Sequence, residues 1–497
     1  MYIKSLTKLH RDNTGNTIDL YTILVSDGQN LGVLEYLYKY QIRYLDRSAS
    51  WHKKLIQIVG MLLDYMEANA SYYDTPVDLC GGFVDAVYDG TIDETGVDMS
   101  QLYWLPKTTE NANQLLEMLN DFSDWVYQIY GTIQLNPWLN ATDYQERINW
   151  IAHINRNTHS FLKHLDKTSD ASEISKKVRS VLKRNKTVSY EDEKISFPQD
   201  MVFELLFNGF KKKKIYDDIL DQYNWRDICI TILLVGGGIR LSEAFHIWVS
   251  DIYPDPYKDK VSVVRIYHPR DGKAPQDLKN IKTGRYITDR ASYLSIKYGM
   301  IPRNMYPPKD NRFAGWKNPR LDSSSEKYMH VFWRDDFWGK LFYKSWEMYL
   351  KKRLKENVKD DNPYAFVCLS KNEKGNILTI NSFRDSYKKA IEKIGLKYGK
   401  KYGTTPHAHR HAYAKALLKM NFEDNSILTR ALHHKSEESK NVYTQLSIDE
   451  ISKIMNLAST NIENPFGIKK DIDLDLESFI QESENKWKRI NIGKRKK

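Results

Sequence analysis

Apolar residues recur at steps of three and four along most of this chain, a spacing that places them on one face of a helix. In the first third the spacing predicts helices over 31–45, 51–66 and 113–130. Polar turns separate these segments, so together they predict a helical bundle spanning roughly residues 20–165. The many aromatic residues of these helices then serve as core packing rather than as stacking surfaces for bases.

The rest of the chain mixes helical and strand patterns. A buried helix is predicted over 227–235 and stops at three consecutive glycines, 236–238. Segments 261–267 and 329–333 have the composition of short strands. Between them, 269–326 shows no clear period and is too long for an ordinary connection, so we expect an insertion. Further helices are predicted over 240–248, 336–356, 382–394, 406–420 and 427–433.

These patterns predict a mostly helical α+β protein with a small β-sheet. At about 150 residues per domain, 497 residues suit two or three domains. We expect an N-terminal helical domain over 1–165, a basic linker over 166–196 and a mixed second domain over 197–460. A C-terminal tail over 461–497 completes the chain.

Charge narrows the class of partner. The chain has 75 Lys and Arg against 64 Asp and Glu, a net charge of +11, which favours a polyanion such as nucleic acid or an anionic membrane surface. No apolar run is long enough to span a membrane, and the N-terminus lacks a signal-peptide pattern. The three cysteines lie far apart, which excludes a disulfide framework and a cysteine zinc site. We therefore expect a soluble intracellular protein.

One stretch of the predicted linker concentrates positive charge. Six cations fall within eleven residues: Lys176, Lys177, Arg179, Lys183, Arg184 and Lys186. Such a run is either a solvated linker or a segment that follows DNA phosphates. The seven cations of 486–497 leave a similar choice between DNA contact and solubility.

Three separated motifs carry the candidate chemistry. The first runs from Gly238 through Arg240 to Glu243, and the second opens a helix as Pro406-His407-Ala408-His409-Arg410-His411. Arginine guanidinium groups match the negative oxygens of a phosphoryl transition state bidentately, and two arrive from different parts of the chain. His407 and Arg410, three residues apart, share the face near a helix N-terminus, where the dipole also favours phosphate.

The third motif is Leu432-His433-His434-Lys435-Ser436, followed by Val442-Tyr443. His434 offers a further hydrogen bond to phosphate. Tyr443 is a hydroxyl nucleophile whose pKa near ~10 needs a cationic surround. The three motifs together supply what phosphodiester cleavage by a side chain requires.

In this order and spacing the motifs resemble those of the tyrosine recombinases, or phage integrases, over roughly residues 200–455. The resemblance implies that the N-terminal bundle is a core-binding domain, that the two domains close around double-stranded DNA, and that four protomers act on two sites. It implies strand cleavage through a 3′-phosphotyrosyl link, with no cofactor and no metal. It assigns catalytic roles to Arg240, His407, Arg410, His434 and Tyr443, with Glu243 in support.

The chain departs from the family pattern at two positions. His409 stands where the family usually has leucine, and His433 where it usually has glycine. The family's general-acid lysine is also ambiguous. Lys317 precedes the predicted strand 329–333, Lys282 matches the usual turn as Lys-Thr-Gly-Arg, and Lys273 is a third candidate.

Other interpretations remain open from the sequence. The histidines of the second and third motifs could bind a metal, although no carboxylate or cysteine pair completes such a site. The same fold would also serve a type IB topoisomerase or a catalytically silent DNA-binding protein. The length of the chain and its long insertion favour an integrase of a mobile element, acting in a bacterial cytoplasm.

Overall fold

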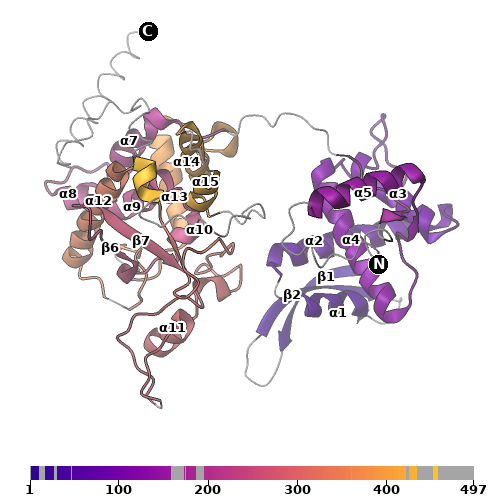
Figure 1. Cartoon of the computed structure of the whole chain (residues 1–497), viewed down its shortest axis with the longest axis horizontal. Helices are drawn as coiled ribbons and strands as arrows, with labels where there is room; N and C mark the ends of the chain where they lie inside the picture. The colour runs from indigo at the N-terminus through magenta and orange to yellow at the C-terminus, as the bar shows by residue number, and fades with distance from the viewer. Residues whose placement is uncertain are drawn as a thin grey trace, which may run out of the picture. The chain divides into compact units, whose positions relative to one another are not determined.

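The computed structural model forms two compact units, Met1–Tyr190 and Glu191–Lys497, each described here by itself. The residues that it describes are 2–10, 17–26, 31–45, 47–157, 173, 175–185, 195–281, 283–359, 361–370, 372–420, 425–433 and 451–456. Helices and strands both contribute, so the expected α+β class is confirmed (Figure 1). Of the described helices, none has the length and apolarity needed to cross a membrane.

The first unit begins with an antiparallel sheet that the sequence patterns did not predict. Its strands are β1 (Tyr2–His10), β2 (Thr17–Ser26) and β3 (Leu31–Val33), in that order. The predicted helix over 31–45 is therefore wrong for 31–33, where the backbone pairs with β2. Buried and exposed residues do not alternate strictly along β1 and β2, so the strand signal is weaker than the helical period that follows.

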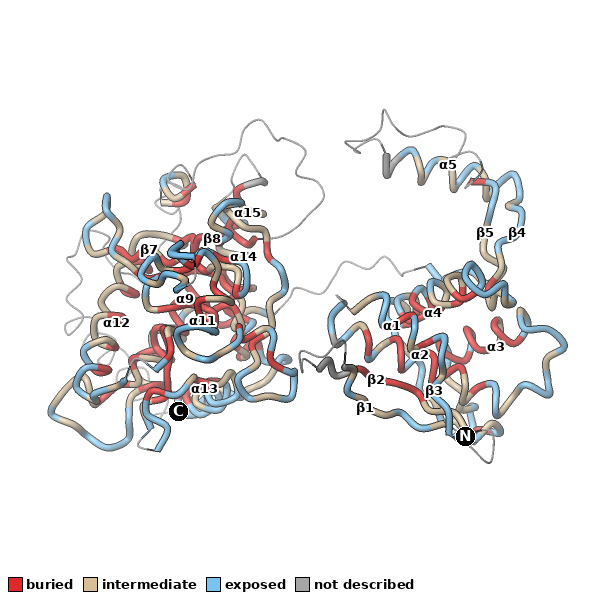
Figure 2. Tube along the Cα trace, turned by 90° about the horizontal axis from the view of Figure 1, so that it is seen from below, coloured by how far each residue is buried: buried red, intermediate tan, exposed pale blue. Residues whose placement is uncertain are grey.

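Four helices complete the core of the first unit. They are α1 (Glu35–Arg43), α2 (Ala49–Asn69), α3 (Pro76–Asp89) and α4 (Thr109–Tyr130). Leu55, Phe83 and Leu115 meet in the core without exposure, and Figure 2 shows these helices with their buried faces turned inward. The helices predicted over 51–66 and 113–130 are confirmed.

The basic stretch after residue 175 also packs on the first unit. Strand β5 (Lys177–Arg179) pairs antiparallel with β4 (Trp138–Asn140), and α5 (Asp143–Asn157) follows β4. Val181 packs against the core, and its N–H donates to Asn136 Oδ1 at 2.8 Å. The structure thus differs from the expected linker over 166–196, because the side chains of Arg179 and Val181 find partners on the first unit.

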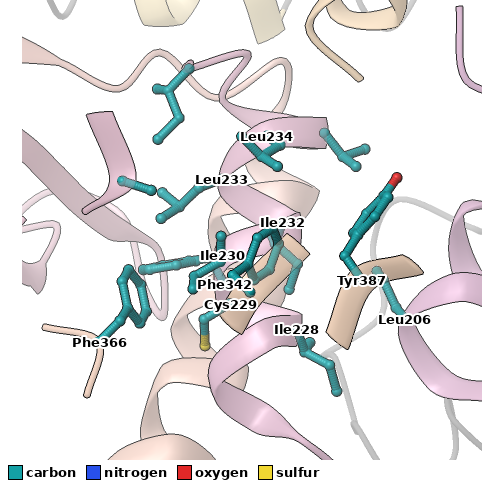
Figure 3. Packing of buried hydrophobic residues seen from close by; sticks show 14 of the residues in the cluster. Leu206, Ile228, Cys229, Ile230, Ile232, Leu233, Leu234, Phe342, Phe366 and Tyr387 are labelled. Atoms are coloured by element: carbon teal, nitrogen blue, oxygen red, sulfur yellow. The ribbon is translucent and has the colours of Figure 1, made fainter. Parts of the chain in front are cut away.

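The second unit is built around α9 (Trp225–Gly236), in which every residue except Arg226 is buried. Helices α12 (Asp336–Lys355), α13 (Ile380–Lys393) and α14 (Pro406–Lys419) pack against it. Figure 3 shows Ile228, Ile232 and Leu233 of α9 among aromatic rings of its neighbours. An apolar residue at nearly every position lets α9 be covered on all sides. All four helices were predicted within a few residues.

A three-stranded antiparallel sheet lies beside these helices, in the order β6 (Ile252–Pro254), β7 (Ser262–Tyr267) and β8 (Tyr328–His330). The predicted strands correspond to β7 and β8. The insertion between them contains α11 (Arg290–Tyr298), which the sequence patterns missed. Buried Arg290 donates to the buried carboxylate of Asp251 at 2.9 Å, which ties the insertion to the unit.

The remaining elements are short. The predicted helix over 240–248 is right only for α10 (Leu241–Ala244), because the carbonyl of Ile247 accepts from Ala365 instead of continuing a helix. The other helices are α7 (Val202–Glu204), a π-helical turn Leu205–Gly209, α8 (Ile219–Gln222) and α15 (Asn425–Ala431). Single 3₁₀ turns occur at Ala70–Tyr72, Gln199–Met201, Val249–Asp251, Arg303–Met305 and Lys400–Tyr402.

Candidate active site

The end of α9 and the start of α14 meet at a glycine turn. Gly238 adopts φ +60°, a left-handed conformation that costs glycine little. A Cβ at this position would lie 2.2 Å from the ring of Tyr413, which is fully buried on α14. The chain can therefore turn here only with glycine, and the turn delivers Arg240 two residues later.

Arg240 is held by Glu243 at the start of α10. Its backbone N–H donates to Glu243 Oε2 and its Nη1 donates to Oε1, both at 2.7 Å. The Glu243 side chain is only 1% exposed, whereas that of Arg240 is 22% exposed. The buried carboxylate thus fixes the guanidinium while leaving part of it open to a ligand, as the supporting role expected for Glu243 requires.

Arg410 occupies the first turns of α14 and is 5% exposed. Its Nη1 donates to the carbonyl of Gly238 at 2.6 Å, and its Nη2 donates to the carbonyl of Leu432. Burial, and after it the positive charge of Arg240, lowers the pKa of Arg410 to about 10, so the group stays charged at neutral pH. Because the anchors of Arg410 are neutral carbonyls, its positive charge remains available to an anion beside Arg240.

His407 lies one turn before Arg410 and is exposed at the N-terminus of α14. The pKa of His407 lies below its ordinary value. The largest cause is burial of part of the ring, and smaller contributions come from the neighbouring groups His411, Arg410, Lys317 and Arg240. His407 is therefore neutral at pH 7, and its ring packs edge-on against His411, with centroids 4.6 Å apart. His407 and Arg410 thus share a region of positive charge.

The lysine candidates differ in their surroundings. Lys317 is exposed, and its charge acts on His407 across the site. Lys273 forms an ion pair with Glu326 and its N–H donates to the carbonyl of that residue at 3.0 Å, so it is engaged in holding the insertion. Lys282 lies outside the described residues. The geometry therefore favours Lys317 among the described candidates.

His434 and Tyr443 also lie outside the described residues. His433, the residue before His434, is part of the described structure. Its side chain is buried and so does not serve as a phosphate contact. It is 3% exposed, with φ +51°, and its Nε2 lies 2.9 Å from the carbonyl of His330. The sequence patterns gave His433 only a possible role as a metal ligand and gave none to its neighbour Asp322. The glycine that the family usually has at position 433 was the available signal for a left-handed backbone.

The described histidines do not gather as metal ligands. Within the described ranges, no group of three or more His, Cys, Asp or Glu side chains is placed to hold a metal ion. His409 points into the core, where its Nε2 lies 2.7 Å from the hydroxyl of Tyr387. Burial lowers its pKa to about 3, so His409 acts as a neutral core residue in place of the family's leucine.

The basic cluster of the first unit divides into paired and exposed cations. Arg179 donates to Asp124 Oδ1 at 3.0 Å and stacks over Trp138. Arg184 pairs with Asp85 at 2.9 Å and with Asp89, and Lys183 Nζ lies 3.3 Å from Glu117. Lys176 and Lys177 are exposed, whereas Lys186 lies outside the described residues. Several of the cations that were expected to contact DNA therefore form ion pairs that stabilise the first unit.

Comparison with known proteins finds one matching family model, in the second unit, and several similar solved structures. Residues 341–450 match the model described as the phage integrase family. No curated protein matches the chain. Its structure is similar to that of an XerA recombinase, with 14% identity and a TM-score of 0.29, covering 86% of this chain and 100% of that one.

Two further solved structures are similar. One is the Tn1549 transposon integrase in complex with transposon right end DNA, with 12% identity, a TM-score of 0.40 and coverage of 85% of this chain and 97% of that one. The other is a lambda integrase dimer bound to a COC′ core site, with 13% identity, a TM-score of 0.36 and coverage of 83% and 98%. The matched span 341–450 includes His407, Arg410 and the positions of His434 and Tyr443. Residues 341–450 thus match the phage integrase family, the family of the tyrosine recombinases.

Proposed function

We propose that this protein is a site-specific recombinase that cleaves and rejoins DNA strands through a 3′-phosphotyrosyl intermediate. One observation carries the proposal: Arg240 and Arg410 are both oriented by fixed partners, Glu243 and the Gly238 carbonyl, at the same turn. Preorganised donors stabilise the charge that develops on phosphate oxygens, because no reorganisation is needed during the reaction. A surface that only held DNA would not need its arginines fixed by buried partners.

The proposed reaction exchanges one phosphodiester bond for another. The Tyr443 hydroxyl oxygen attacks phosphorus, the bond from phosphorus to the 5′ oxygen breaks, and the phenol proton passes to neutral His407. Lys317, or Lys282 in its place, protonates the leaving 5′ oxygen, and His434 donates to a phosphate oxygen. The bond energy is kept in the phosphotyrosyl link, so an incoming 5′ hydroxyl can reverse the step without nucleotide or metal.

The biological setting follows from the same proposal. Exchange of strands between two duplexes needs four cleavages, so we expect four protomers on two DNA sites. The basic net charge of +11 suits this partner. We further propose that the protein is the integrase of a mobile element in a bacterial cytoplasm, which sequencing of the DNA junctions around its gene would test.

The decisive experiment is covalent trapping with the full-length protein. A supercoiled plasmid carrying DNA from both flanks of the gene is incubated with the protein and stopped with detergent. We expect an adduct on the 3′ end of the cut strand, absent in Tyr443→Phe and present in the control Tyr402→Phe, whose ring is 39% exposed. An adduct that survives in Tyr443→Phe, or none in the wild type, would refute the proposal.

Two further arms of this experiment separate the alternatives. Relaxation of a plasmid that lacks the flanking DNA would indicate a type IB topoisomerase. EDTA should leave adduct formation unchanged, because side chains supply the positive charge. If EDTA abolished cleavage and zinc restored it, the histidines would have to be reassigned as metal ligands.

A further inference from the structure

His433 stands in a backbone conformation that its residue type rarely adopts. Its φ is +51°, and a residue with a Cβ keeps such a conformation only where its surroundings hold it there. The peptide that joins it to Leu432 carries the carbonyl that accepts a hydrogen bond from Arg410 Nη2. The direction of that carbonyl therefore depends on the backbone at His433.

The His433 side chain is held by two contacts, a hydrogen bond and a ring stack, and lies near one carboxylate. Its Nε2 lies 2.9 Å from the carbonyl of His330, which can only accept, so this nitrogen carries the proton. Its Nδ1 lies 3.7 Å from Asp322 Oδ2, and its ring stacks on Phe332 with centroids 5.8 Å apart. Burial lowers the pKa of His433, so the ring is neutral at pH 7.

Asp322 connects this contact to the surrounding elements. Its carboxylate, 3% exposed, accepts from Arg430 Nε on α15 and from the N–H of His330 on β8, both at 2.8 Å. Two residues earlier, the N–H of Arg320 donates to the carbonyl of His433 at 3.3 Å. The end of the insertion between β7 and β8 thus contacts the main chain of residue 433 through Arg320, and Asp322 fixes His330, whose carbonyl accepts from the His433 side chain.

We propose that His433 is a positioning residue for Arg410, acting through the Leu432 carbonyl and held in place by the His330 carbonyl and the Arg320 N–H, with Asp322 fixing His330. The inference rests on the proposed function, in which Arg410 binds the scissile phosphate. Arg410 has one anchor on the turn after α9 and one on the turn after α15. If the second carbonyl rotates away, a buried guanidinium loses one of two acceptors and its orientation toward phosphate.

The inference predicts that substitution of His433 slows cleavage because it displaces Arg410. A small misplacement of a catalytic group can cost about 10²-fold in rate. We expect His433→Ala to slow single-turnover adduct formation by about 10- to 100-fold, with the affinity for the flanking-DNA plasmid nearly unchanged. His433→Asn should recover part of the rate, since asparagine tolerates positive φ, while its shorter amide does not reach the His330 carbonyl as Nε2 does.

The test is a double-mutant cycle with Arg410→Lys, because lysine cannot bond both carbonyls in the same geometry. In the Arg410→Lys background, His433→Ala should change the rate by less than about twofold, well below the product of the separate losses. If His433→Ala does not fold, Asp322→Asn takes its place in the same cycle. His409→Gln, at a buried histidine on α14 that bonds Tyr387, controls for a general loss of stability and should leave the rate unchanged.

The outcomes separate the two proposals. No adduct from the wild-type protein would refute the proposed function itself. An adduct from the wild type, with losses at His433 and Arg410 that simply multiply, would refute the positioning role alone, as would an unchanged rate in His433→Ala. A loss confined to DNA affinity would also overturn it, because His433 would then act on binding rather than on Arg410.

Discussion

Arg410 donates a hydrogen bond of 2.6 Å to the main-chain carbonyl of Gly238. The bond joins α14 to the turn that ends α9, and the same turn places Arg240 two residues later. Two guanidinium groups that approach from different parts of the sequence therefore share one rigid anchor. A main-chain acceptor between two packed helices moves less than a side chain would, which suits a site that must match a transition state closely.

Replacement of Gly238 tests this anchor. Gly299 is a matched control, because it also has positive φ (+63°) but has open space where a Cβ would stand. Gly299→Ala should lower the free energy of unfolding by about 1–2 kcal/mol through backbone strain. Gly238→Ala should cost about 1–3 kcal/mol more, because the added methyl must displace the buried ring of Tyr413. Denaturant unfolding measures both, and equal losses would show that the turn has room that the structure does not suggest.

Substitution of Arg410 separates catalysis from binding. Arg410→Ala removes one preorganised donor, which typically costs about 10²–10³ in rate. Its contribution to affinity is one phosphate contact among many, so the dissociation constant of the DNA complex should change far less. Single-turnover cleavage and a binding titration on the same plasmid give the two numbers. Parallel losses would mean that Arg410 only holds DNA.

The helices that build the site could be predicted because their patterns are long and regular. Helices α9, α12 and α14 each carry ten or more residues with apolar positions on the packed faces. The motif residues Arg240 and Arg410 were found from their types and order alone. Their meeting at Gly238 follows from helix packing, which no local pattern encodes.

Other parts of the fold could not be predicted for specific physical reasons. The strands β1 and β2 are stabilised by pairing with each other over nine positions, a property of two segments rather than one. Asp322 lies in a segment without period, and its role depends on Arg430 and His330, which are distant in sequence. His409 and His433 belong to the motifs by sequence, yet burial makes the first a core residue and the second a backbone anchor.

Buried histidines should make the second unit sensitive to mild acid. Burial lowers the pKa of His409 to about 3, that of His246 to about 3 and that of His330 to about 4, from the ordinary value of 6.5. Below pH 6.5 the unfolded chain therefore binds more protons than the folded chain, so stability falls as pH falls. At pH 5 each such histidine should cost about 2 kcal/mol relative to pH 7.

The variant His409→Gln isolates one of these groups. The amide keeps a hydrogen-bonding group near Tyr387 but does not titrate between pH 7 and pH 5. The loss of unfolding free energy between these two pH values should be smaller than in the wild type by about 2 kcal/mol. An identical loss in both proteins would place the pH dependence on other groups.

The last prediction concerns the exposed cations of the first unit. Arg179 and Arg184 are paired with carboxylates, whereas Lys176 and Lys177 project without a recorded ion pair among the described residues. If this segment follows the DNA backbone, each phosphate neutralised adds about −0.9 to the slope of log affinity against log salt. The pair Lys176→Gln and Lys177→Gln should therefore flatten that slope by up to about two units.

Specific and non-specific DNA should be affected alike, because phosphate contacts carry no sequence information. The rate of cleavage of bound DNA should stay the same. Arg179→Gln serves as the control: it breaks the pair with Asp124 and should lower the melting temperature while leaving the slope unchanged. If the lysine pair leaves the slope unchanged as well, the basic segment only completes the fold of the first unit, and the positive charge that attracts DNA must lie elsewhere on the chain.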